Sequence, residues 1–171
     1  MAHEILCVSS EAYPIIKTGG LADVVGALPL ALSSHDMHVT TLLPGYKAVM
    51  AGSKGAKILH SYDNLLGVKA RLLSFSHAGL DLIVLDAPAL YAREVGPYAD
   101  QFGADWPDNW QRFAALGRVA SDLAGGLSED YQPDLVHAHD WQAAMACVYM
   151  KYGNEKARAT PNVLTLSLIH I

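Results

Sequence analysis

The sequence predicts an α/β protein with a Rossmann-like, doubly wound and mainly parallel sheet. Two observations support this fold class. Short apolar runs rich in β-branched residues alternate with longer segments in which apolar residues recur at helical spacing. Polar loops rich in Gly and Pro follow several of these runs, as expected where strands end at the carboxyl edge of an open sheet.

The beginning of the chain predicts a β-α-β unit. Residues 4–9 form a short apolar strand that leads into a loop at 10–20. From Leu21 onward apolar residues recur at helical spacing until a polar stop at 33–36. Residues 39–43 are β-branched and predict a second strand, so we expect a right-handed crossover and parallel pairing with the first.

The middle of the chain has a different pattern. Residues 68–75 and 80–85 are strand-like runs, and the short turn at 76–79 predicts that they form a hairpin. Residues 91–106 are rich in Gly, Pro, Tyr and Asp and show no periodicity. A long loop without regular structure inside a compact domain is usually functional, so we interpret this segment as a site loop.

The last third returns to alternating strands and helices. Asp108 can cap a helix that continues through 113–127. A core strand at 135–137 precedes a helix at 141–152, and a last strand follows at 163–165. Because no linker or internal repeat divides the chain, we expect one domain.

Composition limits the partners and the compartment. The formal charge is −5 and the basic residues are scattered, which argues against nucleic acid as a partner. The amino terminus has a short apolar run without a basic flank, so it predicts neither a signal peptide nor a membrane span. Cys7 and Cys147 lie in apolar surroundings and in no Cys-x-x-Cys spacing, which favours buried thiols and a cytoplasmic protein.

The loop before the first predicted helix combines a cation with two glycines. Lys17 precedes Gly19 and Gly20 by a few positions, at a helix start whose unpaired N–H groups and dipole favour an anion such as phosphate. The segment is neither a Walker A loop nor a Gly-x-Gly-x-x-Gly fingerprint, which argues against an ATPase or a dehydrogenase. The alternative is a tight turn at the glycines with a solvated Lys17.

A second polar segment, His137-Ala138-His139-Asp140, follows the core strand. It lacks the His-x-His-x-Asp-His pattern of zinc hydrolases, so we expect no metal here. The carboxylate of Asp140 lies at a strand end beside a helix start, where it can accept sugar hydroxyls, cap the helix, or do both. Five aromatic residues are open to stacking on a sugar or to core packing: Trp106, Trp110, Trp141, Tyr91 and Tyr98.

Three blocks give the chain a family resemblance. The run at 17–29 reads Lys-Thr-Gly-Gly-Leu-Ala-Asp-Val-Val-Gly-Ala-Leu-Pro, and it resembles the amino-terminal signature of bacterial glycogen synthases and plant starch synthases. Residues 105–109, with Arg-Phe at 112–113, and Val-His-Ala-His-Asp-Trp at 136–141 match in the same order. The resemblance extends over residues 3–165.

The resemblance implies a retaining glucosyltransferase that moves glucose from ADP-glucose to the non-reducing end of an α-1,4-glucan such as glycogen. The implied architecture is the amino-terminal half of a GT-B fold, in which two Rossmann-like domains face a cleft. No cofactor is implied. A departing ADP develops negative charge, which a lysine and a helix amino terminus can stabilise without a metal.

The resemblance also implies the site residues. Asp140 and Asp23 are the expected catalytic residues, which line the donor-glucose and acceptor side of the cleft. The expected substrate-binding residues are Lys17, Thr18, Gly19, Gly20, Tyr98 and His139. Lys17, Gly19 and Gly20 are expected at the diphosphate. Tyr98 and His139 are expected on the sugar side.

The resemblance further suggests how the chain is divided. We expect residues 1–165 to be an incomplete amino-terminal catalytic domain, inactive without the family's carboxyl-terminal domain. Residues 166–171 depart from the family pattern, so we expect them to be a non-native tail. Two alternatives remain: a non-catalytic module that binds glucan or nucleotide, and a sugar-nucleotide transferase of another family on the same architecture.

Overall fold

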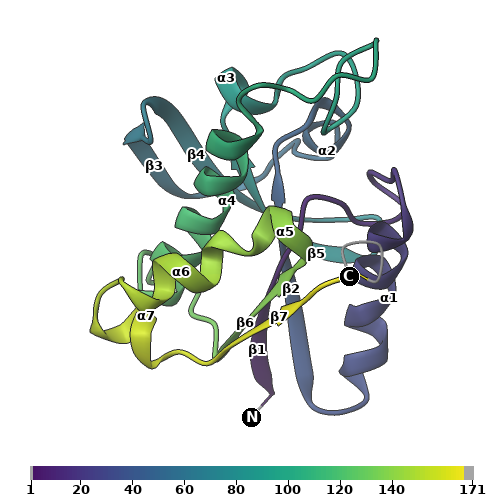
Figure 1. Cartoon of the computed structure of the whole chain (residues 1–171). Helices are drawn as coiled ribbons and strands as arrows, with labels where there is room; N and C mark the ends of the chain where they lie inside the picture. The colour runs from purple at the N-terminus through teal and green to yellow at the C-terminus, as the bar shows by residue number, and fades with distance from the viewer. Residues whose placement is uncertain (1, 168–171) are drawn as a thin grey trace.

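A mixed sheet runs through the centre of the molecule in the computed structural model, which describes residues 2–167 (Figure 1). Within that range the sheet has seven strands in the order β3-β4-β5-β2-β1-β6-β7. The strands are β1 (His3–Val8), β2 (Met37–Pro44), β3 (Lys57–Leu65), β4 (Val68–His77), β5 (Leu80–Asp86), β6 (Leu135–His139) and β7 (Asn162–Thr165).

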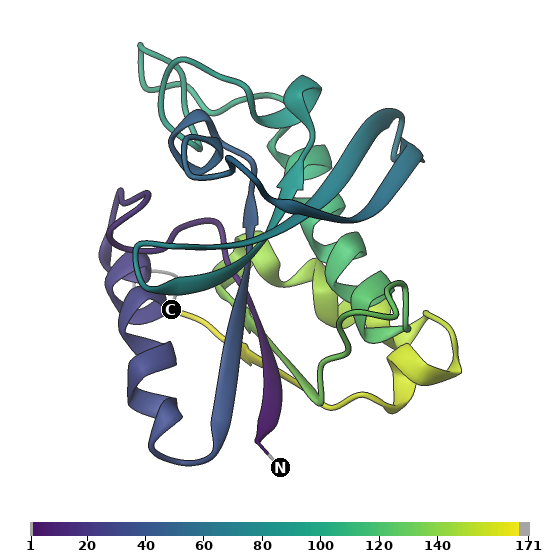
Figure 2. The ribbon, with the colours of Figure 1, turned by 180° about the vertical axis from the view of Figure 1, so that it is seen from behind.

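Helices cover both faces of this sheet. They are α1 (Gly20–Ser33), α2 (Lys47–Met50), α3 (Pro88–Tyr91), α4 (Asn109–Ala124), α5 (Asp140–Ala143), α6 (Met145–Lys151) and α7 (Glu155–Ala159). The two opposite views show α1 on one side of the sheet and α4 with α6 on the other (Figures 1 and 2). The doubly wound α/β prediction is therefore confirmed. Between residues 2 and 167, no helix is long and apolar enough to cross a membrane.

Strand order places a crevice at the centre of the sheet. The strands from β5 through β2, β1 and β6 to β7 are parallel, whereas β4 pairs antiparallel with both β3 and β5. The chain leaves β1 through α1 toward β2, and later returns through α4 to β6 on the opposite side of β1. The connections thus diverge at β1 and β6, and ligands of open α/β sheets bind beyond the carboxyl ends of such strands.

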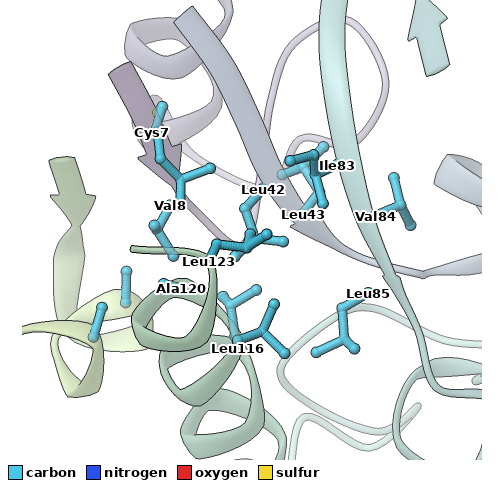
Figure 3. Close-up of a cluster of buried hydrophobic side chains, with 14 of the residues drawn as sticks. Cys7, Val8, Leu42, Leu43, Ile83, Val84, Leu85, Leu116, Ala120 and Leu123 are labelled. Carbon is cyan, nitrogen blue, oxygen red and sulfur yellow. The ribbon is translucent and has the colours of Figure 1, made fainter. Parts of the chain in front are cut away.

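The core lies between the central strands and α4 (Figure 3). The inner positions of β1, β2 and β5 are almost continuously buried, as expected for parallel strands with helices on both faces. Leu116 and Leu123 of α4 are 0% exposed, and each such leucine stabilises the fold by about 1.5–3 kcal/mol. Cys7 is buried as predicted, and burial raises the pKa of its thiol to about 12, whereas Cys147 is only half-buried.

Several local expectations differ from the structure. Strand β3 was not predicted, because it is an edge strand that is mostly exposed and has no apolar alternation. Helix α7 was also missed; it is short and is capped by Asn154, whose Oδ1 accepts the Ala157 N–H at 2.9 Å. Asp108 does occupy the N-cap position of α4, but the capping prediction is wrong because its carboxylate pairs with Arg93 instead.

At the amino-terminal ends of three parallel strands, one histidine forms hydrogen bonds to both neighbouring strands. His38 of β2 lies with Nδ1 2.8 Å from Glu4 Oε2 of β1, and with Nε2 3.0 Å from Asp81 Oδ2 of β5. These hydrogen bonds, first to Glu4 and then to Asp81, raise the pKa of His38 above its ordinary value despite an opposing contribution from burial. The protonated imidazole therefore links three neighbouring strands.

This linkage predicts a pH-dependent contribution to stability. Because the folded pKa of His38 is raised, the contribution is complete below the unfolded value of about 6.5 and is lost as the pH rises through the folded pKa. His38→Gln should therefore lower the free energy of unfolding in urea by a few tenths of a kcal/mol near pH 6, and by less near pH 8. A deficit that grows with pH would contradict this account.

Candidate functional site

The loop that follows β1 is organised by a buried carboxylate. Glu11 is 2% exposed. Its carboxylate accepts hydrogen bonds from the Thr18 hydroxyl at 2.6 Å, from the Thr18 N–H, and from the Gly19 N–H at 3.3 Å. Because a buried carboxylate is stable only when it is well hydrogen-bonded, these donors hold residues 10–20 in a compact loop that leads directly into α1.

The same carboxylate reaches the second loop, residues 92–108. The Tyr98 hydroxyl donates to Glu11 and lies 2.7 Å from Ser10 Oγ. Burial, followed by the hydrogen bond to Glu11, raises the pKa of Tyr98 well above its ordinary value. The hydroxyl therefore remains a proton donor, and Glu11 joins two loops that are far apart in the sequence.

Two side chains of helix α4 hold the second loop in place by hydrogen bonds to its backbone. Arg112 is 0% exposed, and its guanidinium donates to the carbonyls of Leu90 at 2.9 Å and Pro97 at 2.7 Å. Asn109 donates to the carbonyl of Tyr98 at 2.8 Å and accepts from Arg112 at 2.6 Å. These hydrogen bonds of Asn109 and Arg112 therefore position Tyr98.

The third segment follows β6 and contains a strained residue. Asp140 is 4% exposed and has a φ of 59°, a left-handed conformation that is uncommon for residues other than glycine. Such backbone costs about 1–3 kcal/mol and is concentrated at functional sites, although aspartate tolerates it better than most residues. Asp140 is not the N-cap of α5, a position held by His139; its Oδ1 accepts the Ser167 N–H at 2.7 Å.

His139 lies beside Asp140 as a buried, neutral imidazole. It is 2% exposed, and burial, with a smaller contribution from His137, lowers its pKa to about 4. His137 itself hydrogen-bonds Thr165 Oγ1 at 2.8 Å. Among residues 2–167, Nε2 of His139 has no hydrogen-bond partner. A buried polar atom of this kind is available to a hydroxyl or another polar group of a ligand.

These three segments enclose a cavity of about 780 Å³ at the carboxyl ends of β1 and β6. A space of this size suits a small-molecule ligand. It brings together six predicted site residues: Thr18, Gly19, Gly20, Tyr98, His139 and Asp140. Glu11, Asp105, Trp141 and Gln142 line it as well. The sequence alone does not indicate a role for Glu11, because that role depends on contacts with residues distant in the chain.

Two predicted site residues lie outside this lining. Lys17 and Asp23 pair with each other, with Nζ 2.7 and 2.8 Å from the two carboxylate oxygens, and both side chains are about half exposed. An exposed ion pair contributes little to stability, so a ligand can compete for either partner at small cost. The expected roles of these two residues remain predictions.

The two glycines are not required by backbone conformation. Gly19 is extended, with a φ of −148°, and Gly20 is the first residue of α1. A Cβ added at either position would meet nothing within 4 Å. By contrast, a Cβ added at Gly26 would lie 2.3 Å from the carbonyl oxygen of Tyr13. Gly26 is therefore required for the close packing of α1 against the backbone of Tyr13. The N-cap residue of α1, Gly19, has no side chain that could cap the helix, and its own N–H donates to Glu11.

The cavity therefore offers two kinds of chemistry. At the start of α1, glycine-flanked N–H groups and the positive end of the helix dipole favour an anion. At the end of β6, a carboxylate and a neutral imidazole suit hydroxyl groups. Between residues 2 and 167, no group of three or more His, Cys, Asp or Glu side chains is arranged to hold a metal ion.

The predicted consequence of the Glu11 network is a large loss of stability in Glu11→Gln. The amide has one acceptor oxygen where the carboxylate has two, and it carries no charge, so the charge-assisted hydrogen bonds from Thr18, Gly19 and Tyr98 are weakened or lost. We expect the free energy of unfolding in urea to fall by about 2–4 kcal/mol. The exposed Glu129→Gln serves as the control and should change it by less than about 0.5 kcal/mol. Equal effects would contradict the assigned role.

Comparison with known proteins gives consistent matches. The family described as starch synthase catalytic domain matches residues 4–171. The glycogen synthase of Mesorhizobium japonicum is 53% identical over 163 residues, which is 95% of this chain and 34% of that protein. The glycogen synthase of Novosphingobium aromaticivorans is 52% identical over 167 residues, 97% of this chain and 34% of that protein. The chain thus spans about one third of the length of these relatives.

A solved structure shares the fold. The catalytic domain of starch synthase IV from Arabidopsis thaliana, bound to ADP and acarbose, superposes with a TM-score of 0.70 at 23% sequence identity. The match covers 96% of this chain and 33% of that chain. At this identity the likeness supports the fold alone.

Proposed function

The chain belongs to the starch synthase catalytic domain family, and from that premise we propose that it is the amino-terminal part of an ADP-glucose-dependent glycogen synthase. The complete enzyme would transfer glucose to the non-reducing end of an α-1,4-glucan with retention of configuration. One observation carries the proposal: a single cavity at the switch point contains both the open start of α1 and the pair His139 and Asp140.

On this proposal the donor diphosphate binds at the start of α1. The N–H groups of the first turn of α1, from Gly20 onward, would donate to the diphosphate as negative charge develops on the departing ADP, while Glu11 holds the Thr18 and Gly19 N–H groups and so fixes the preceding loop. Lys17 would exchange its exposed partner Asp23 for the diphosphate. We choose an adenine nucleotide because the chain belongs to the starch synthase family, one member of which, starch synthase IV of Arabidopsis thaliana, is bound to ADP.

The sugar would lie toward the end of β6. There His139 is neutral at physiological pH and has an Nε2 without a partner among residues 2–167, so it can bond a sugar hydroxyl without bringing a second charge. The nearly buried carboxylate of Asp140 would orient hydroxyls and stabilise positive charge on the glucosyl group. Asp23 would contribute to this side only after release from Lys17.

An acceptor surface continues from the cavity. Trp141 lines both the cavity and a neighbouring apolar groove of about 650 Å³, which also contains Trp110 and Met145. Trp110 is 72% and Trp141 42% exposed, whereas Tyr91, another aromatic candidate, is fully buried in the core. Exposed aromatic faces suit the apolar faces of pyranose rings. We assign this groove to the glucan chain.

The direct test is glucosyl transfer from labelled ADP-glucose to glycogen, in a protein that carries this chain within the full length of its relatives. We expect transfer from ADP-glucose, weaker transfer from UDP-glucose, and none from residues 1–171 alone. Glucan affinity without turnover would instead indicate a binding module. Preference for UDP-glucose would indicate a transferase of another kind.

Gly19→Ala makes this test specific for the site. Its methyl group meets nothing in the fold, so stability should be unchanged, but the group would occupy the space at the start of α1. If the methyl group displaces the diphosphate from one N–H of α1, the dissociation constant for ADP should rise roughly tenfold to a hundredfold, the equivalent of one charge-assisted hydrogen bond. Gly96→Ala, which also meets nothing within 4 Å, is the matched control.

The acceptor assignment predicts a selective effect of Trp110→Ala in the same full-length protein. We expect the half-saturating glycogen concentration to rise roughly fivefold or more, because a stacking face is lost, while the KM for ADP-glucose stays constant. Tyr152 is 79% exposed and lies outside the groove, so Tyr152→Ala is the control. Equal effects of the two substitutions, or a change in donor KM alone, would reject the assignment.

A further inference from the structure

A second, smaller cavity lies between α2 and the loop at 92–108. Its volume is about 200 Å³, and it shares no lining residue with the 780 Å³ cavity. Three basic side chains from different parts of the chain line it: Lys47 of α2, Arg93 of the loop and Arg112 of α4. Cations brought together in this way repel one another unless negative charge is supplied.

Arg112 is the unusual member of this group. Its guanidinium is 0% exposed, and its hydrogen bonds go to two backbone carbonyls and to the side-chain oxygen of Asn109, all neutral acceptors. Among residues 2–167, its Nη2 has no hydrogen-bond partner. Burial lowers the pKa of Arg112, as expected for a cation that lacks sufficient compensation.

A second buried polar atom without a partner lies in the same lining. Tyr46 is 5% exposed, and its hydroxyl makes no hydrogen bond within the described part of the chain. Burial raises the pKa of this hydroxyl, so it remains a donor. The cavity is thus lined by two residues that each carry a buried donor without a partner among residues 2–167, a guanidinium N–H and a phenol O–H.

The carboxylates around the cavity do not balance its cations. Lys47 pairs with Glu94, which is highly exposed at the rim, and Arg93 pairs with Asp108. Arg112 forms no ion pair with any residue between 2 and 167, so no carboxylate in direct contact offsets its charge; the buried carboxylate of Glu11 acts on Tyr46 only from a longer distance. The ligand that suits this site is therefore a small anion with several acceptor oxygens.

We propose that the pocket formed by Tyr46, Lys47, Arg93 and Arg112 binds a small oxyanion of the phosphate class. A volume of about 200 Å³ admits inorganic phosphate and excludes a nucleotide sugar. Arg112 also holds the carbonyl of Pro97 and, through Asn109, that of Tyr98. Anion binding would therefore stabilise the loop that delivers Tyr98 to the larger cavity, which couples the two sites.

The test is phosphate-dependent stability of the 171-residue chain. Urea unfolding is followed at increasing inorganic phosphate, against chloride at matched ionic strength and pH, and below about 10 mM so that general salting effects stay small. We expect a saturable increase in stability, with the unfolding constant reduced about elevenfold at a phosphate concentration ten times the Kd. No effect, or a linear effect without saturation, would overturn the proposal and leave water as the occupant.

Matched variants locate the effect. Tyr46→Phe removes only a hydroxyl that has no partner among residues 2–167, so it should fold normally and raise the Kd for phosphate; Lys47→Met should do the same. Glu94→Gln releases Lys47 and should lower the Kd. Lys151→Met, on α6, is the control and should change nothing. An effect that survives Tyr46→Phe and Lys47→Met but is lost in Lys17→Met would overturn the proposal.

Discussion

The buried carboxylate of Glu11 accepts hydrogen bonds from two loops that are separated by almost half of the chain. Three come from Thr18 and Gly19, which precede α1, and one comes from Tyr98 in the loop at 92–108. The carboxylate thereby holds the amino terminus of α1 beside the cavity at the carboxyl end of β1. Together with the hydrogen bond between Ser10 Oγ and the Tyr98 hydroxyl, it links the loop before α1 to the Tyr98 loop.

Several other features of the site destabilise the folded chain at the places where a ligand is expected to bind. Asp140 has left-handed backbone, Nε2 of His139 is buried without a partner among residues 2–167, and the N-cap of α1 is a glycine without a capping side chain. Each of these features costs folding free energy, and their concentration in one cavity is typical of a binding site. Arg112 repeats the pattern at the smaller cavity, where a buried cation lacks full compensation.

Sequence patterns predicted the elements whose burial is strong and periodic. These include β1, β2, the hairpin of β4 and β5, and α4, whereas α1 was predicted from its apolar spacing although only Ala22 and Val25 are buried. They failed for β3, an exposed edge strand, and for the cap at Asp108, whose carboxylate found Arg93 instead. The resemblance supplied six residues of the cavity. The roles of Glu11 and Arg112 depend on contacts with distant loops, which no local pattern encodes, and the pairing of Lys17 with Asp23 is likewise a feature of the folded chain.

The most direct test of this account is a double-mutant cycle between Glu11→Gln and Tyr98→Phe, measured as free energies of unfolding in urea. Tyr98→Phe removes only the hydroxyl and keeps the ring against Phe113 and Trp141. If Glu11 joins the two loops through this hydroxyl, the two losses should be non-additive, with a coupling energy of about 1–3 kcal/mol. Additivity within about 0.5 kcal/mol would contradict the account, because Glu11 would then not couple the two loops through the Tyr98 hydroxyl.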